Sequence, residues 1–304
     1  MTLTPQLEKF LDAAVAIRLD PDKTEAAFIA RQLVQATLPH KDPKTEIWSR
    51  TNGNLSLGMQ AGINPITGRR YGLPYGTIPR LLLFWITTEA LRTKNRRLEL
   101  GKSLASFMRE LGLSPATGGG KRGDAKRLRE QMERLFHTKI SFHQTQDQKG
   151  RNGYAWMHMD VAPEGMLWWD ESQPEQSALW ESWIQLGEKF YTAIINSPVP
   201  VDMRALRALK RSPLALDLYA WATYTAYRTQ QNRQARSISW EALHKQLGTE
   251  YKDIKDFKKY ARLALRKIKA VYDDLGIEYV RGGVKVLPCN PAITIKPKAE
   301  PDKP

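Results

Sequence analysis

The chain has 304 residues but only one cysteine, Cys289, so it cannot form a disulfide within itself. A single thiol suits a reducing compartment. The longest strongly apolar run, Leu81–Ile86, is far too short to span a bilayer. The first fifteen residues lack the basic stretch and unbroken apolar stretch of a secretory signal. We therefore expect a soluble, cytoplasmic protein that does not enter a membrane.

The sequence also lacks the motifs of common catalytic and cofactor sites. Gly118–Lys121 superficially resembles a phosphate-binding loop, but Pro115 stands where the first glycine is required, and Arg122 replaces the required Ser or Thr. One cysteine and five scattered histidines offer no spacing typical of a zinc site. We expect no catalytic residues, no cofactor and no metal, and hence no enzyme.

Positive charge, by contrast, is plentiful. The formal net charge is +15. Lys and Arg are concentrated in residues 76–165 and 203–304, whereas residues 166–202 are acidic. Two basic blocks separated by an acidic one predict two units that face a polyanion, of which DNA is the obvious example.

The segment Lys252–Lys269 is the most informative part of the chain, because it holds eight basic residues against two aspartates. Its apolar residues recur at spacings of three and four, which predicts the buried face of an amphipathic helix. Its cations recur with the same period on the opposite face: Lys255, Lys258, Lys259, Arg262, Arg266 and Lys269. We expect this face to meet DNA, with Arg262 and Arg266 as candidates for bidentate contacts to guanine.

The two basic blocks look like copies at an offset of about 136 residues, since Trp85 then aligns with Trp221 and Leu111-Gly112 with Leu247-Gly248. Each block predicts an apolar helix, a short strand, a short helix capped by Ser, a basic helix and a hairpin. The expected ranges are 78–91, 98–100, 103–111, 122–136, 139–143 and 154–161 in the first block, and 213–227, 237–239, 239–247, 253–274, 277–280 and 284–287 in the second.

This order of elements is that of the winged-helix form of the helix-turn-helix. The predicted fold class is α+β, mostly helical, with two tandem winged-helix domains related by internal duplication. The predicted divisions are an N-terminal helical extension and loop, the first winged-helix domain, an acidic Trp-rich connector, the second winged-helix domain, and a disordered Pro-rich tail: 1–75, 76–165, 166–202, 203–288 and 289–304. Within the extension we expect helices over 6–17 and 23–37 and a loop over 51–76.

The two copies differ in how their cations are placed. Arg122, Lys126 and Arg129 are the DNA-facing candidates of the first copy, but they share a face with Glu130 and Glu133. In the second copy, Arg281 and Lys285 of the expected hairpin sit where phosphates would lie. We therefore expect the second copy to be the main reader of sequence and the first to carry self-association between monomer and dimer.

A cluster of tryptophans lies in and after the first hairpin: Trp156, Trp168, Trp169, Trp180 and Trp183. Because the region beyond the hairpin is acidic, we interpret the cluster as core packing or an interdomain contact. Stacking on unpaired bases is the alternative.

Residues 71–113 contain the run Pro79-Arg80-Leu81-Leu82-Leu83-Phe84-Trp85, followed by Leu111-Gly112-Leu113. This segment, and its continuation to residue 136, resembles the RepA family of plasmid-encoded replication initiators. The resemblance implies double-stranded DNA binding at repeated sites (iterons) of a plasmid origin, help in opening AT-rich DNA, and recruitment of host DnaA and the replicative helicase. It also implies monomers that bind iterons and dimers that repress their own gene, which would make the protein part of plasmid copy control.

Two other functions stay open at this point. A transcriptional repressor without an initiator role would use the same DNA-binding elements. An origin-nicking rolling-circle enzyme would need two histidines on one strand, for a metal, and a tyrosine nucleophile. His143 and His158 stand alone in the sequence, so we interpret both as surface or hydrogen-bonded strand residues.

Overall fold

A computed structural model of the chain describes residues 4–117, 123–148, 151–169, 181–247 and 251–293. The structure is mixed α/β, and 47% of the described residues are helical and 23% lie in strands, so the expected mixed and mainly helical composition is confirmed. Within the described ranges, every helix is too short or too polar to cross a membrane.

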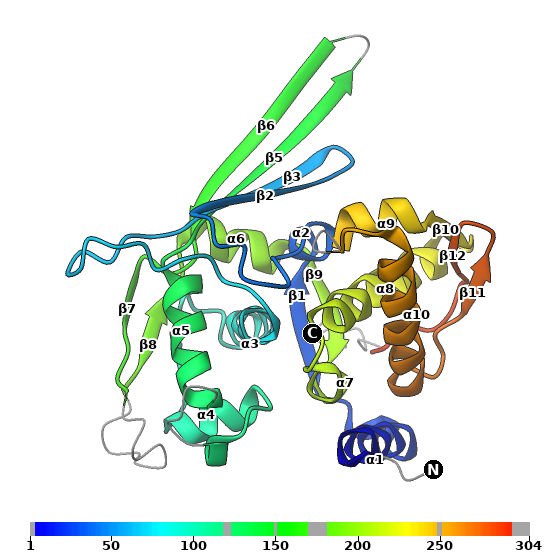
Figure 1. Cartoon of the computed structure of the whole chain (residues 1–304), viewed down its shortest axis with the longest axis horizontal. Helices are drawn as coiled ribbons and strands as arrows, with labels where there is room; N and C mark the ends of the chain where they lie inside the picture. Colours follow the sequence, from blue (N-terminus) through cyan, green and yellow to red (C-terminus); the bar gives the residue numbers. More distant parts are fainter. Residues whose placement is uncertain (1–3, 118–122, 149–150, 170–180, 248–250, 294–304) are drawn as a thin grey trace, which may run out of the picture.

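Two series of elements follow the same order of types along the chain (Figure 1). The first series is α3 (Thr77–Thr93), β4 (Arg97–Glu99), α4 (Leu104–Glu110), α5 (Asp124–Phe136), β5 (Lys139–Gln148) and β6 (Arg151–Asp160). The second series is α8 (Pro213–Asn232), β10 (Arg236–Ser239), α9 (Trp240–Leu247), α10 (Ile254–Val271), β11 (Ile277–Val280) and β12 (Gly283–Val286). Each lies where the sequence predicted it, with ends displaced by a few residues.

The helix ends follow from local chemistry. The Ser103 hydroxyl accepts a hydrogen bond from the backbone of Ser106, whose own side chain bonds back to Ser103, so a capping box begins α4. The Ser212 hydroxyl accepts from Ala215 N–H at the start of α8. Gly112 follows α4 with a φ of 72°, the left-handed conformation that ends a helix at little cost. The other expected stop, Gly248, lies outside the described residues.

The strands form four small antiparallel sheets, ordered β2-β3-β5-β6, β10-β12-β11, β4-β8-β7 and β1-β9. The remaining strands are β1 (Ala26–Ala30), β2 (Ile47–Asn52), β3 (Leu55–Gln60), β7 (Glu164–Met166), β8 (Trp183–Gln185) and β9 (Pro198–Asp202). The two series differ in their pairing, because β10 pairs with β12 of its own series whereas β4 pairs with β8. The hairpin β5–β6 projects from the body of the molecule (Figure 1).

Two expectations for the N-terminal region were wrong. Residues 23–37 are not one helix: they contain a 3-10 turn at Pro21–Lys23, strand β1 and the short helix α2 (Arg31–Gln35). Strand β1 pairs with β9, and this distant partner overrides the local helical preference. Residues 51–76 are not all loop, because the hairpin β2–β3 extends to Gln60. Its strands turn at Gly53, with a φ of 59°.

The acidic stretch between the two series is built into the fold rather than lying outside it. Strand β8 pairs with β4 and β7, helix α6 (Glu188–Asn196) follows, and β9 pairs with β1. Helix α7 (Met203–Leu209) then leads into α8. The boundaries proposed from the sequence stay predictions. Of the expected Pro-rich tail, residues 294–304 lie outside the described ranges.

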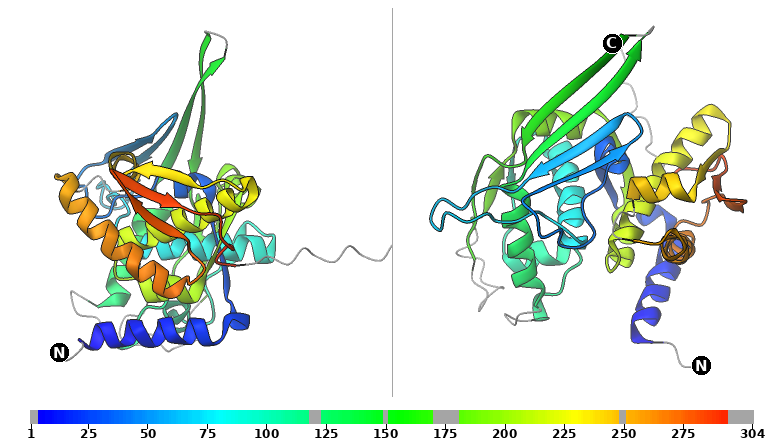
Figure 2. Two further views of the ribbon diagram at one scale, coloured as in Figure 1. Left: turned by 90° about the vertical axis from the view of Figure 1, so that its right-hand side faces the viewer. Right: turned by 45° about the horizontal axis from the view of Figure 1, so that its top comes forward.

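The N-terminal helix α1 (Pro5–Leu19) agrees with the expected helix over 6–17 and packs against α7 and α10. Figure 2 shows α1 running beneath the C-terminal end of α10. There, the Arg18 guanidinium donates hydrogen bonds to the carbonyl oxygens of Lys269 and Ala270, at 3.2 and 3.0 Å, and pairs with Asp273 at 2.9 Å. A cation at carbonyls that lack helical partners stabilises the end of α10.

Candidate DNA interface

Helix α10 is divided lengthwise into a buried and an exposed face. Its N-cap, Asp253, accepts a hydrogen bond from Lys255 N–H at 2.7 Å. The expected apolar stripe packs against α8, with Phe257, Ala261 and Ile268 fully buried. Burial of this face fixes which side of the helix the cations present.

The six predicted cations of α10 lie opposite that buried stripe. Lys255, Lys259, Arg266 and Lys269 are exposed, and Lys258 and Arg262 are half-buried. Within the described part of the chain, no carboxylate comes within ion-pair distance of any of the six. Like charges three and four residues apart destabilise an isolated helix, so this face carries a repulsion that a bound polyanion would relieve.

Arg262 is held differently from its neighbours. Its guanidinium carbon lies 4.9 Å from the centre of the Tyr279 ring in β11 and 5.7 Å from that of the Trp240 ring in α9. These two rings stack on each other with centroids 6.3 Å apart. The Arg262 Nε is buried and has no hydrogen-bond partner among the residues that the structure describes. Arg262 therefore joins α10, α9 and the hairpin through cation–π contacts.

The positive charges of α10 also act on the hairpin β11–β12. Burial raises the pKa of the Tyr279 hydroxyl, while the nearby positive charges of Arg262 and Arg266 oppose that rise. Of the two hairpin cations predicted from the sequence, Arg281 is exposed beside the turn glycine Gly282. Lys285 pairs with Glu278 across the hairpin at 3.3 Å, so its charge is partly neutralised.

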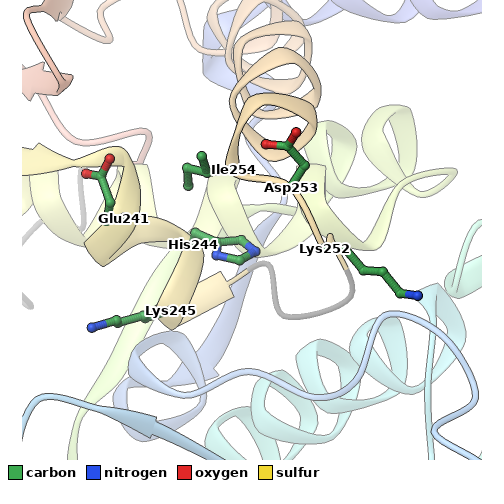
Figure 3. Close-up of a pocket in the computed structure, with 6 residues that line it drawn as sticks. All are labelled: Glu241, His244, Lys245, Lys252, Asp253 and Ile254. Atoms are coloured by element: carbon green, nitrogen blue, oxygen red, sulfur yellow. The ribbon is translucent and has the colours of Figure 1, made fainter.

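A shallow hollow lies between α9 and the start of α10, lined by Glu241, His244, Lys245, Lys252, Asp253 and Ile254. The His244 ring occupies the middle, where its Nε2 lies 2.9 Å from the carbonyl oxygen of Tyr251, and Lys245 and Lys252 extend outward on either side (Figure 3). Both lysines are exposed. They were missing from the predicted site, although a cation on the polar face of the short helix was visible in the sequence.

The cations of α5 are largely paired, unlike those of α10. Arg129 Nε donates to Glu133 Oε1 at 3.2 Å, and Arg127 pairs with Asp124. Lys126 is half-buried. The third predicted cation of this copy, Arg122, and the glycine-rich segment before it lie outside the described residues. Among the described residues, α5 thus presents less free positive charge than α10.

The tryptophans of the cluster have different environments, and Trp169 packs against the hydrophobic core as expected. Trp156 and Trp168 are 59% and 50% exposed, so core packing was the wrong interpretation for both. Trp183 lies beneath the Arg97 guanidinium, 4.0 Å from its ring centre, and Trp180 lies outside the described residues.

His143 and His158 do not stand alone as the sequence suggested, because the hairpin β5–β6 brings their rings to 6.0 Å. Tyr154 lies on the same face, 6.4 Å from His143. Over the residues that the structure describes, no group of three or more His, Cys, Asp or Glu side chains is placed to hold a metal ion.

Comparison with known proteins gives one family match. The family model described as "Plasmid encoded RepA protein" matches residues 73–242, more than half of the chain. The match covers the whole first series and ends within α9, so α10 and the hairpin β11–β12 lie outside it. No curated protein matches the chain.

Two solved structures are similar at low sequence identity. A crystal structure of selenomethionine derivatives of domains 2 and 3 of RctB has a TM-score of 0.49 and 12% identity, covering 84% of this chain and 95% of that one. A crystal structure of RctB domains 2–3 has a TM-score of 0.47 and 13% identity, covering 84% and 96%.

Proposed function

This chain belongs to the family of plasmid-encoded RepA proteins, which are plasmid replication initiators, and from that premise we propose that it binds repeated sites (iterons) at a plasmid origin through α10. The single observation that carries this proposal is the row of cations along α10, from Lys255 to Lys269, none of which has an ion-pair partner among the described residues. Neutralisation of DNA phosphates by such a row supplies most of the affinity of a DNA-binding protein.

We further propose that each series is a winged-helix unit and that the two arose by duplication. The common order of element types supports this, as does the three-stranded sheet β10-β12-β11, which ties the hairpin to its helices. In such a unit the second helix of the turn enters the major groove and the hairpin reaches neighbouring phosphates. Helix α10 and β11–β12 would take these roles, and α5 would be the groove-entering helix of the first series.

The remaining parts of the proposal extend the family role. Bound protein helps to open adjacent AT-rich DNA in the cytoplasm and recruits host DnaA and the replicative helicase, without catalysis of its own. Self-association through the first series gives a dimer that represses the protein's own gene, while the monomer binds iterons. Sedimentation of the full chain over a concentration series tests the monomer–dimer equilibrium.

A minimal plasmid that carries only this gene and its flanking DNA separates an initiator from a repressor. We expect that plasmid to replicate with the wild-type gene and to be lost with Lys255→Ala/Lys259→Ala. A repressor alone would reduce expression from its promoter and give no replication. The flanking DNA should contain directly repeated sites of about two helical turns each, beside an AT-rich stretch, since each turn is about 10.5 bp.

The nicking alternative has one observation in its favour, the approach of His143, His158 and Tyr154 on one face of β5–β6. Relaxation of a supercoiled origin plasmid in the presence of a divalent metal decides it. We expect no relaxation; relaxed product that disappears in a Tyr154→Phe variant would replace the initiator proposal with an enzymatic one.

A further inference from the structure

The four-stranded sheet β2-β3-β5-β6 has one face packed on the body and one face turned to solvent. Side chains alternate between the faces of a strand, and the register of β5 with β6 places residues 141, 143 and 145 beside 158, 156 and 154. On the packed face, Leu57, Ile140 and Met159 are buried. On the other face, His143, Tyr154, Trp156 and His158 are all exposed.

These four residues form a continuous aromatic platform. The rings of Tyr154 and Trp156 lie 5.4 Å apart, His143 lies 6.4 Å from Tyr154, and His158 lies 6.0 Å from His143. Tyr154 is 66% exposed and Trp156 59% exposed. Adjacent aromatic side chains left this open to water retain apolar surface that a ligand can cover.

The strand next to β5, strand β3, carries small residues beside the platform. Ser56 and Gly58 of β3 are the register partners of His143 and Ser141, so the neighbouring strand presents small side chains next to the rings. The Ser141 hydroxyl lies 2.8 Å from His158 Nδ1, which fixes that ring on the sheet. The side of the platform that faces β3 is therefore bordered by small residues.

The chemistry of this face favours unpaired bases over a protein partner. Among the side chains that the structure describes on this face, the charged ones are Lys139 and Asp160, which are register partners at the base of the hairpin and offset each other. Its aliphatic surface is limited to Ile47 on the edge strand β2, whereas the core of a protein interface is largely apolar. Stacking on aromatic rings needs only the flat face that every base has.

We propose that the aromatic platform binds single-stranded DNA by stacking unpaired bases on Trp156 and Tyr154. The proposal rests on the proposed function, because opening of AT-rich DNA at an origin would supply the strand. The platform lies on the hairpin that projects from the first series, whereas the cations proposed to meet duplex DNA lie on α10 of the second (Figure 1). One chain would thus hold duplex sites and an opened strand on separate surfaces.

The test uses the full chain and two probes at one fixed salt concentration: a labelled oligothymidylate of 20 nucleotides and the origin duplex. Trp156→Ala and Tyr154→Ala should each weaken oligothymidylate binding by about 5- to 150-fold and leave duplex binding unchanged. Trp156→Phe and Tyr154→Phe should keep most of the affinity, because they keep a ring. Tyr227→Ala, which removes another exposed aromatic from α8, is the matched control and should change neither.

Thermal unfolding of each variant should match that of the wild type, because both platform side chains are exposed. Oligothymidylate binding that is unchanged by Trp156→Ala and Tyr154→Ala overturns the proposal. So does a shift from dimer to monomer in sedimentation without loss of oligothymidylate binding, which would assign the face to a second copy. Lys255→Ala/Lys259→Ala separates the two proposals: normal origin-duplex binding by that variant contradicts the proposed function and leaves the platform result standing.

Discussion

Arg80 of α3 and Asp217 of α8 face each other at the centre of the molecule, where Arg80 Nε donates to Asp217 Oδ1 at 2.7 Å and Arg80 Nη2 donates to Oδ2 at 2.8 Å. His40 Nε2 lies 2.8 Å from the same Oδ2. Arg80 also donates to the carbonyl oxygens of Leu38 and Pro39. All three ionisable side chains are buried. This network ties the first series, the second series and the N-terminal region together.

Removal of the negative charge from this network should be strongly destabilising. Asp217→Asn leaves the Arg80 guanidinium buried without its counter-charge, which should lower the free energy of unfolding by ~3–5 kcal/mol in urea denaturation. The control is Glu89→Gln, because its partner Arg92 is 70% exposed; the expected cost there is ~0–1 kcal/mol. Equal effects of the two substitutions would show that the buried pair contributes no more than a surface pair.

The same pair should make the stability depend on pH in the acid range. Burial alone would raise the pKa of Asp217, but the charge of Arg80 and the hydrogen bonds from His40 and Arg80 outweigh it and hold the pKa below its ordinary range. A carboxylate with a lowered pKa stabilises the fold above its unfolded value of ~3.9, and this contribution is lost as the pH falls below that value.

The difference in unfolding free energy between wild type and Asp217→Asn should therefore shrink as the pH falls from about 5 to about 3. Urea denaturation of both proteins over this range measures it. A difference that grows in acid would contradict the assigned direction of the pKa shift.

The elements of the two series could be predicted because their signals are local. Periodic apolar residues, Ser103 and Ser212 as caps and Gly112 as a stop all act within a few residues of one another. Strand β1 could not be predicted this way, because its partner β9 lies far along the chain. The hairpin β2–β3 does have a local signal, because the two residues between its strands are Gly53-Asn54, a pair typical of a tight turn. A buried arginine such as Arg80 gives no sequence signal of its partner.

Arg266 should act as a reader of sequence. It is exposed on the cation face of α10, where a bidentate contact to guanine is worth ~1–3 kcal/mol of discrimination. Arg266→Ala should therefore weaken binding to origin DNA more than binding to a scrambled duplex of the same length, as measured by fluorescence anisotropy. An equal loss on both duplexes would make Arg266 a phosphate contact.

Arg262 should behave differently, because its guanidinium already lies over Tyr279 and Trp240. Arg262→Ala should lower the melting temperature and weaken binding to origin and scrambled duplexes alike, since the hairpin loses its contact with α10. Tyr279→Phe keeps the ring and serves as the control. A loss confined to origin DNA, with an unchanged melting temperature, would return Arg262 to the role of a guanine contact predicted from the sequence.

The cation face of α10 was predictable for the same reason as the helix itself, since one period places both the apolar and the basic residues. The sequence did not indicate which of these cations would contact a carboxylate or an aromatic ring. Lys285 forms an ion pair with Glu278 of the neighbouring strand, and Arg262 lies over the Tyr279 ring of β11. The aromatic platform was missed because residues 143, 154 and 156 become neighbours only through the register of β5 with β6.

The affinity for origin DNA should fall steeply with salt, and two residues of α10 should account for a measurable part of the slope. With roughly 6–10 phosphate contacts, the affinity should drop by about 10³–10⁵ between roughly 50 and 200 mM salt, because bound cations release counterions from the duplex.

Lys255 and Lys259 are exposed, lie one turn apart and have no carboxylate partner within the described residues. Lys255→Ala/Lys259→Ala should therefore reduce the slope of log affinity against log salt by about 2, and by the same amount on origin and scrambled DNA. Lys189→Ala removes an exposed cation from α6 and should leave the slope unchanged. If the lysine pair and the control alter the slope equally, the net charge of the chain rather than the cation face of α10 governs binding.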